Sequence, residues 1–492
     1  MSRLMMQMKS WCSKLVATAL SLMAAGVLWV PQAAQALPSF ARQTGQNCVA
    51  CHAGGQFPEL TPYGRMFKLT GYTIGERTLP FSVMGVAGVS NVADRTKSDA
   101  PDADFQKNFA PILASGSLFI AGKVTDNIGA FVQTTYDNYA VTNANGSFSG
   151  HSQADNMDFR YADHIVDGKK DWIYGVSVNN NPSVSDPWNT AAAWMQYVPV
   201  PSPTSYQFAD GAGTYPGFGA GGNIAGVTAY TLWNKTIYAE LGAYKTANQA
   251  FSFMRAGIDP ASRTALSGSN PYWRLALTRE WGPHNLMVGT SGMTARVFDA
   301  GSDIGDPGNL GRFRNNGIDG QYQYLLDPHT VTLQAAYMRQ VQTYSPNAIA
   351  AAPVGLFVLA DGTTPIDPVH LSDTSHIFRT KASYVYQAKY GGSLGFFNKT
   401  GTTNTLNQTS GYDASTGQVT SDSSLRVNGN LSGNPATRGL TYEAFWMPKQ
   451  NVRVGAQYTA YNKFNGASTN YDGFGRNAKD NNTLFLYAWV AY

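Results

Sequence analysis

The sequence predicts an all-β fold: a transmembrane outer-membrane β-barrel of about sixteen antiparallel strands, with a small N-terminal helical segment plugging its lumen. Three observations support this fold class. From Phe81 onward, stretches of about ten residues alternate in polarity, as strands with one apolar face do. Short turns alternate with long polar loops along the chain. The chain also ends on a segment rich in aromatic residues.

A typical strand pair lies at 113–124 ("LASGSLFIAGKV") and 128–139 ("IGAFVQTTYDNY"), and the turn between them predicts a β-hairpin. The same unit recurs to the end of the chain. Strands are expected to begin near residues 81, 111, 128, 157, 171, 224, 236, 270, 285, 313, 330, 376, 393, 437, 451 and 482. The segment 180–223 leaves a further strand pair open, because it contains the stretch "AAAWMQYVPV".

A soluble β-sandwich or propeller is the alternative to a membrane barrel. Short turns on one side and long loops on the other are typical of outer-membrane barrels, whose short turns face the periplasm. The strands have the ~9–11 residues that a bilayer requires. In the last segment, Phe485, Tyr487 and Trp489 share one face before the terminal Tyr492. These features favour a barrel over 81–492, in contact with outer-membrane lipid.

The N-terminus indicates export. Basic residues precede the apolar run Leu15–Val30, and Ala34-Gln35-Ala36 matches a cleavage site, so residues 1–36 are predicted to be a signal peptide. An uncleaved anchor is the alternative, and the shortness of the run argues against it. Three positive charges of the formal +4 belong to this segment, which leaves +1 and no basic block. Nucleic acid is therefore not an expected partner.

The remaining cysteines mark one site. Apart from Cys12 in the signal, the chain has Cys48 and Cys51, and His52 follows directly. C-x-x-C-H is the attachment motif of haem c, in which the thiols form thioethers and the histidine is the proximal iron ligand. A zinc site needs about four ligands, a thioredoxin-like pair needs a βαβ unit, and a disulfide leaves His52 unexplained. One covalently bound haem c is therefore predicted.

The distal iron ligand stays open between two residues. Met66 follows His52 closely enough to fold back over the ring, and a methionine ligand raises the reduction potential. His164 shares the parity of Asp158 and Arg160, which predicts that all three side chains point into the lumen. The other histidines are expected in turns, in loops or on the apolar face: His151, His284, His329, His370 and His376.

Residues 37–80 are predicted to form a monohaem cytochrome segment. The segment is too short to build a stable core without the haem or the barrel. "FPELTPYGRMFKLTGY" (57–72) can form one or two short helices, with Thr61 as the cap and Pro62 in the first turn. Because the segment leads directly into the first strand, we expect it to plug the lumen from the periplasmic mouth.

The order of export signal, "FARQTGQNCVACH", "FPELTPYGRMFKLTGY" and a barrel resembles the fused outer-membrane monohaem cytochrome c-porin family of iron-oxidising bacteria. Specific motif similarity extends from Phe40 to Tyr72. The resemblance implies that Cys48 and Cys51 attach haem and that His52 is an axial ligand. It also implies that electrons pass from extracellular Fe(II) to a periplasmic soluble cytochrome or copper protein, an Fe(II):cytochrome oxidoreductase activity.

Two other functions remain open from the sequence. The chain is also consistent with an outer-membrane porin whose haem segment gates the channel or acts as a sensor. A conduit that carries electrons outward and reduces external metals is the third possibility, because haem electron transfer is reversible.

Overall fold

A computed structural model describes residues 38–55, 59–94, 108–142, 148–190, 223–255, 265–299, 301–351, 370–408, 410–413, 418–421 and 429–492. The expected signal peptide, residues 1–36, lies outside these ranges. Within them, residues from Phe81 onward form a closed antiparallel barrel, and an N-terminal helical segment lies against it. None of the described helices has the length and apolar character needed to cross a membrane.

Sixteen of the described strands make up the barrel wall. Their bounds are β1 Phe81–Val92, β2 Ile112–Lys123, β3 Ile128–Thr142, β4 Phe148–Asp167, β5 Lys170–Asn179, β6 Ile224–Trp233, β7 Ile237–Thr246, β9 Asn270–Trp281, β10 His284–Phe298, β11 Leu310–Leu326, β12 His329–Thr343, β13 Ser372–Tyr386, β14 Tyr390–Gly401, β17 Thr437–Lys449, β18 Val452–Lys463 and β19 Thr483–Ala491. The short strand β8 (Ala265–Leu266) adds to the rim beside β10, and β15 (Ser410–Asp413) pairs with β16 (Gln418–Ser421) outside the wall.

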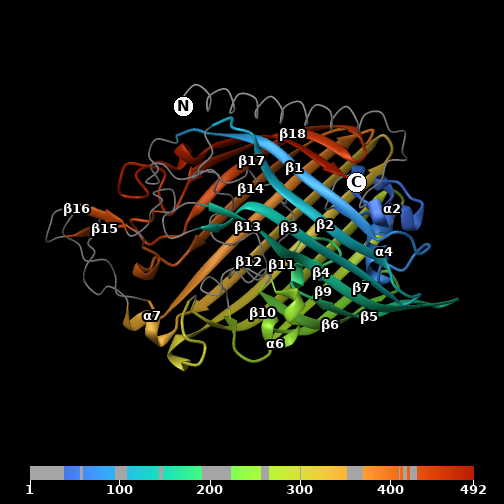
Figure 1. Cartoon of the computed structure of the whole chain (residues 1–492), viewed down its shortest axis with the longest axis horizontal. Helices are drawn as coiled ribbons and strands as arrows, with labels where there is room; N and C mark the ends of the chain where they lie inside the picture. The colour runs from blue at the N-terminus through green and yellow to red at the C-terminus, as the bar shows by residue number, and fades with distance from the viewer. Residues whose placement is uncertain are drawn as a thin grey trace, which may run out of the picture. The chain divides into compact units, whose positions relative to one another are not determined.

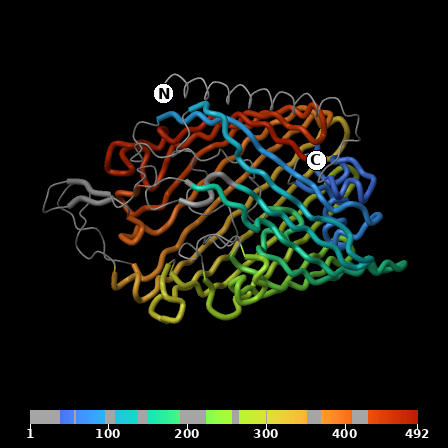
Figure 2. The backbone as a smooth tube through the Cα atoms, in the orientation of Figure 1, coloured from blue at the N-terminus to red at the C-terminus, as the bar shows by residue number. Residues whose placement is uncertain are grey.

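The barrel closes between its first and last strands. β1 pairs with β2 on one side and with β19 on the other, where Val86 lies opposite Trp489 and Ser90 opposite Phe485. Figure 2 shows the blue trace of β1 running beside the red strands at the end of the chain. In the described barrel wall, closure leaves no unpaired strand edge, which is the condition for a sheet to cross a bilayer.

The predicted fold class is confirmed, and most strands begin within four residues of the expected position. β4 is the exception, since it begins at Phe148 rather than near 157. The polar sequence before residue 157 predicts a loop. In the structure it continues the hydrogen-bonded pairing with β3, where Ser152 lies opposite Tyr136. No strand pair is inserted between β5 and β6, because these two strands pair directly; residues 191–222, with "AAAWMQYVPV", lie outside the described residues.

The two faces of the wall have opposite character. On β9, Tyr272, Arg274 and Ala276 are buried in the lumen, whereas Trp273 and Leu275 between them are exposed on the outside. Other outward aliphatic side chains form a belt: Leu118, Ile120, Val176, Val227, Leu241, Leu277, Val288, Ile318, Leu333, Leu394, Val454 and Leu486. An apolar outer band around a polar lumen is the property of an outer-membrane barrel, so the chain is an outer-membrane β-barrel protein.

The two ends of the barrel also differ. Seven short turns lie at one end, at 124–127, 168–169, 234–236, 282–283, 327–328, 387–389 and 450–451. Outward aromatic side chains gather near this end: Trp172, Trp233, Trp281, Tyr384, Tyr386, Tyr390 and Trp446. In Figure 1 the C-terminus lies at this end, and α7 (Pro346–Ala350) and β15–β16 lie at the opposite one. The short turns identify this as the periplasmic end, and the aromatic side chains form a girdle at its membrane interface.

The N-terminal segment folds into α2 (Pro38–Thr44), the single turn α3 (Cys48–Cys51), the 3-10 turn η1 (Ala53–Gly55) and α4 (Pro62–Leu69). Helix α4 begins where the sequence predicts. Thr61 accepts a hydrogen bond from the Gly64 amide, and Pro62 occupies the first turn, where its missing N–H costs nothing. In Figure 1 this blue segment lies at the periplasmic end of the barrel. Arg65 and Lys68 of α4 hydrogen-bond to residues inside the lumen.

Candidate functional site

The residues of the C-x-x-C-H motif are held by the start of α4. The amide of Thr61 donates to the carbonyl oxygen of Cys51 at 2.9 Å, and the amide of His52 donates to that of Cys48 at 2.8 Å. A Cβ atom on Gly64 would lie 2.2 Å from the Cys51 oxygen, so this position requires glycine. His52 also pairs with Leu60 as an isolated β-bridge. The chain between them is thereby folded back on itself.

The motif is also attached to the barrel wall at the periplasmic end. The amide of Cys48 donates to Oε1 of Gln450 at 3.1 Å, and its sulfur lies 3.7 Å from the Gln450 carbonyl oxygen. Gln450 is in the short turn between β17 and β18. A contact between residues 402 positions apart fixes where the motif sits in the barrel.

A cavity opens beside the motif, with about 1330 Å³ of space between protein atoms, part of it open to solvent. Cys48, Cys51 and His52 all line it. Most of the remaining wall is apolar and comes from both the N-terminal segment and the barrel: Phe40, Phe67, Tyr72, Phe119, Phe131 and Trp489. An apolar, partly aromatic cavity next to two thiols and an imidazole fits a covalently attached porphyrin.

The aromatic wall is a packed cluster. The ring of Phe40 stacks on Tyr72 with centroids 5.3 Å apart and meets Phe67 edge-on at 4.8 Å. Phe119 and Phe131, on the barrel strands β2 and β3, have centroids 5.8 Å apart. Each such pair stabilises the fold by ~0.5–1.5 kcal/mol beyond the contribution of its buried area. The aromatic side chains of the cavity wall are therefore packed against one another.

Both motif cysteines are free thiols. Burial raises the pKa of Cys48 to about 12 and that of Cys51 to about 11. Dithiol redox enzymes depend on a depressed pKa, because the thiolate is the nucleophile. The environment of this pair therefore does not favour thiol–disulfide exchange, and it is compatible with thiols that are consumed once in cofactor attachment.

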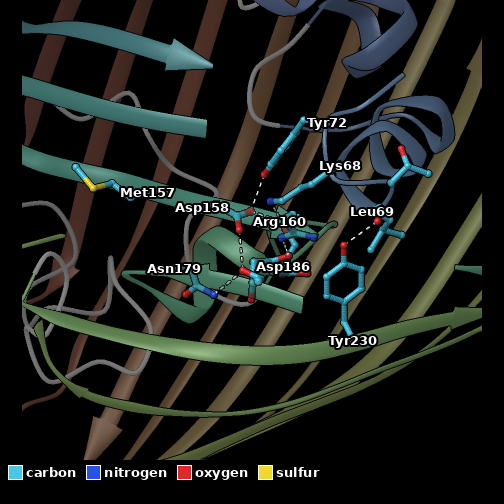
Figure 3. Close-up of polar contacts among 12 residues, drawn as sticks. Lys68, Leu69, Tyr72, Met157, Asp158, Arg160, Asn179, Asp186 and Tyr230 are labelled. Carbon is cyan, nitrogen blue, oxygen red and sulfur yellow. Dashed lines mark hydrogen bonds and ion pairs between the residues drawn. The ribbon is translucent and has the colours of Figure 1, made fainter. Parts of the chain in front are cut away.

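Next to the cavity, a buried polar network joins the plug to the barrel (Figure 3). The hydroxyl of Tyr72 donates to Asp158 at 2.6 Å, and Nε of Arg160 donates to the same carboxylate oxygen at 2.6 Å. Arg160 also lies over the ring of Tyr230, 5.0 Å from its centroid, and the Tyr230 hydroxyl donates to the carbonyl oxygen of Leu69 at 2.8 Å. Each buried charge in this group has a partner, as burial requires.

A second segment enters the lumen from the other end. The connection after β5 folds inward as the short helix α5 (Pro182–Ser185) and continues to Trp188, which is 1% exposed. Nζ of Lys68 donates to the carbonyl oxygen of Asp186 at 2.9 Å, which joins this connection to α4. Arg274 on β9 binds both carboxylate oxygens of Asp319 at 3.0 and 2.7 Å.

Side chains of the plug also reach the wall on β10, β11 and β13. Arg65 donates to Asn285 at 2.7 Å and to Gln323 at 3.0 Å, while Glu59 forms an ion pair with Lys381. Together with the inward connection, these contacts hold α4 inside the described part of the barrel, and a second cavity remains beside the helix, lined by Met66, Trp188 and Glu280 among others. The expectation that the segment plugs the lumen from the periplasmic mouth is therefore confirmed.

The structure does not bring either expected distal ligand to the cavity. Gly64, Phe67 and Lys68 form the face of α4 that lines it. Met66 lies on the opposite face and packs against the cluster that contains Leu69, Trp188 and Leu232. The phase of the helix, at 3.6 residues per turn, turns Met66 away from His52.

His164 keeps the inward parity of Asp158 and Arg160, but it lies beyond the buried part of β4. Its Nε2 is 2.7 Å from Asp171, and its side chain is 31% exposed at the periplasmic rim. Three other histidines each hydrogen-bond a tyrosine hydroxyl on the barrel wall: His284, His329 and His376. No group of three or more histidine, cysteine, aspartate and glutamate side chains that could hold a metal ion occurs in the described ranges.

Sequence reasoning missed two contributors to the site. The inward connection, "NNNPSVSDPW" at 179–188, resembles an ordinary polar loop, although Asn181 before Pro182 is a helix-start signal. The strand aromatics Phe119 and Phe131 were expected simply as strand residues. Neither is recognisable as part of a site until the plug is placed against it.

Neither a protein-family profile nor a curated protein sequence matches the chain. Among solved structures, it is similar to the outer-membrane channel DcaP of Acinetobacter baumannii, with 12% identity, a TM-score of 0.41, and coverage of 84% of this chain and 96% of that one. It is also similar to OmpF of Salmonella typhi in complex with daunomycin (11%, 0.42, 84% and 97%). It is similar as well to an anion-selective porin from Comamonas acidovorans, with 9% identity, a TM-score of 0.39, and coverage of 84% of this chain and 99% of that one. With TM-scores below 0.5, these similarities carry no argument about function.

Proposed function

We propose that this outer-membrane barrel protein is a monohaem c-type cytochrome that accepts electrons from an extracellular donor, with Fe(II) as the first candidate. It passes them to a periplasmic carrier, a soluble cytochrome or a copper protein. The observation that carries the proposal is the apolar cavity lined together by Cys48, Cys51 and His52. Cys48 and Cys51 would hold haem c covalently, and His52 would supply an axial ligand.

Bound haem would supply one-electron redox chemistry, which needs no acid, base or nucleophile from the protein. The residues around the cavity then have three tasks: they hold the ring, exclude water and set the potential through burial and ligands. The aromatic wall of Phe40, Phe67 and Tyr72 serves the first two. The cavity lies beside Gln450 at the periplasmic end, which leaves it accessible to a periplasmic carrier.

The buried network supports an electron conduit more than an open pore. Asp158, Arg160 and Arg274 are each 1% exposed or less, and Lys68 and Asp186 join the plug to the inward connection. A gate that opens would have to break these buried hydrogen bonds and ion pairs at each opening, and their number favours a lumen that stays closed.

The test begins with haem content. Exported protein should retain haem after denaturation, and Cys48→Ser/Cys51→Ser should lose it, while His164→Ala, at the rim, should keep it. Purified holoprotein is then mixed with Fe(II) at several pH values under anaerobic conditions, and the reduced haem bands are followed. Retained haem with no reduction at any pH would exclude Fe(II) as the donor, and absence of covalent haem would end the proposal as a whole.

A porin with a haem-containing gate or sensor is the second candidate, and the observation that favours it is the barrel itself. Sixteen strands enclose a lumen that can hold a water-filled channel. Single-channel recording in planar bilayers separates the two functions. Persistent ion-sized currents from the holoprotein would support the porin and exclude the plugged conduit.

An outward conduit is the third possibility. Oxidation of reduced holoprotein by external Fe(III), without reduction of the oxidised holoprotein by Fe(II), would indicate this function.

A further inference from the structure

Met84 is an inward-facing methionine on the first barrel strand. Along β1, Ser82 and Val86 are buried, whereas Phe81 and Val83 are 49% exposed on the outer face. Alternation at period two therefore turns the side chain of Met84 toward the lumen. The strand also lies at the closing seam of the barrel, where Met84 is opposite Ala491 of β19.

Met84 lines the same cavity as His52. The two residues come from different elements: His52 ends the turn α3 of the plug, and Met84 is part of the wall. A six-coordinate haem takes its ligands from opposite faces of the ring, and the usual protein ligands are histidine, methionine, cysteine and tyrosine. A thioether on the wall is suited to meet an iron whose other ligand comes from the plug.

Other potential ligands among the described lining residues are engaged elsewhere. The hydroxyl of Tyr72 donates to Asp158 at 2.6 Å, and Nζ of Lys68 donates to the carbonyl oxygen of Asp186 at 2.9 Å. Cys48 and Cys51 are assigned to the thioethers. Met66 packs on the other face of α4.

We propose that Met84 is the distal axial ligand of the haem iron. This inference rests on the proposed haem site and adds a residue that the C-x-x-C-H motif does not contain. Because one axial ligand lies on the plug and the other on β1, bound haem would tie the plug to the closing strand of the barrel. Methionine ligation would also raise the reduction potential relative to two histidines, which suits an acceptor for a donor of high potential such as Fe(II).

The experiment compares two methionine variants of the holoprotein, Met84→Leu and the matched control Met66→Leu. Both conserve volume and apolar character, so a core effect should be small in each. The barrel is first verified by its resistance to unfolding in detergent on gels without heating. Haem content is then measured after denaturation, since the thioethers do not depend on the distal ligand. Resonance Raman and near-infrared magnetic circular dichroism report the spin state and the axial ligands.

We expect Met84→Leu to retain haem, to lose the methionine-to-iron charge-transfer band and to gain high-spin signals, with a lower midpoint potential. Met84→His should restore a low-spin spectrum at a potential below that of the wild type. Met66→Leu should leave the spectrum and the potential unchanged. A wild-type spectrum in Met84→Leu, or loss of the band in Met66→Leu, overturns the assignment while the haem site stands. Wild-type protein without covalent haem overturns the proposed function and the assignment with it.

Discussion

Lys68 and Asp186 meet inside the barrel: Nζ of the lysine donates to the carbonyl oxygen of the aspartate at 2.9 Å, across 118 positions of sequence. Lys68 belongs to the segment that enters from the periplasmic mouth, and Asp186 to the connection that enters from the opposite end. Segments thus enter the described lumen from both ends, and both contribute to the wall of the candidate haem cavity, which Lys68, Ser183 and Val184 line.

The buried ion pair between Arg274 and Asp319 is expected to help close the lumen to ions, and removing it tests this role. Arg274→Ala removes the cationic partner of both Asp319 and Asp186, and the uncompensated buried carboxylates should cost ~3–5 kcal/mol of stability. Water and ions should then enter the lumen around residue 274, so planar-bilayer recordings should show larger and more frequent currents than the wild type. Lys169→Ala, in an exposed periplasmic turn, is the control and should match the wild type. Unchanged currents in a folded Arg274→Ala barrel would mean that this ion pair does not limit ion passage through the lumen.

Gly64→Ala tests the packing of α4 against the motif. The new Cβ atom would lie 2.2 Å from the Cys51 carbonyl oxygen, so the backbone has to shift, at a cost of ~1–3 kcal/mol. Displacing the motif should lower the fraction of exported protein that carries covalent haem, measured by haem absorbance per barrel. The matched control is Gly85→Ala, where a Cβ atom meets nothing within 4 Å. Equal haem loading in the two variants would show that the contact does not position the motif.

The raised pKa values of the thiols predict slow alkylation in protein exported without haem attachment. With a pKa of about 11 at Cys51, the thiolate fraction near pH 8 is roughly 100-fold below that of an ordinary cysteine. Iodoacetamide labelling followed by mass spectrometry should therefore be slow and should accelerate about tenfold per pH unit up to pH 10. Urea-unfolded protein is the control and should react at the ordinary rate. Fast labelling of the folded barrel at pH 8 would contradict the burial of the thiols.

Tyr72→Phe removes one hydrogen bond of the buried network and keeps the aromatic ring in the cavity wall. Asp158 retains its bonds to Arg160 at 2.6 Å and to Ser177 at 2.7 Å, so the loss should be moderate, ~1–2 kcal/mol. The midpoint of the heat-dependent gel shift should fall, with haem content unchanged. Tyr161→Phe, on the exposed outer face, should leave the midpoint unaltered. A larger effect of Tyr161→Phe would place the stabilising contact on the lipid side.

Local patterns made much of the architecture predictable. Alternation at period two located the strands, and the contrast between short turns and long loops oriented the barrel. The prediction for β4 was nine residues late because its ladder extends past the apolar part of the strand, where hydrogen bonding continues without a hydrophobic pattern. The candidate site was predictable at Cys48, Cys51 and His52, since adjacent residues carry that chemistry.

The position of Met66 shows the limit of sequence spacing as a guide to which side chains share a cavity. Met66 is close to His52 in sequence, but the phase of α4 turns it toward Trp188. Met84 is further along the chain, and it lines the cavity because the plug folds back beside β1.

The sequence by itself therefore determined the membrane barrel, its orientation and the attachment motif, because these depend on residue type and on periods of a few positions. The tertiary structure decided which aromatic side chains enclose the cavity, which segment meets the plug and which methionine lines the cavity. These depend on contacts between residues such as Lys68 and Asp186, which are distant in the chain and become neighbours only when the barrel closes around the plug.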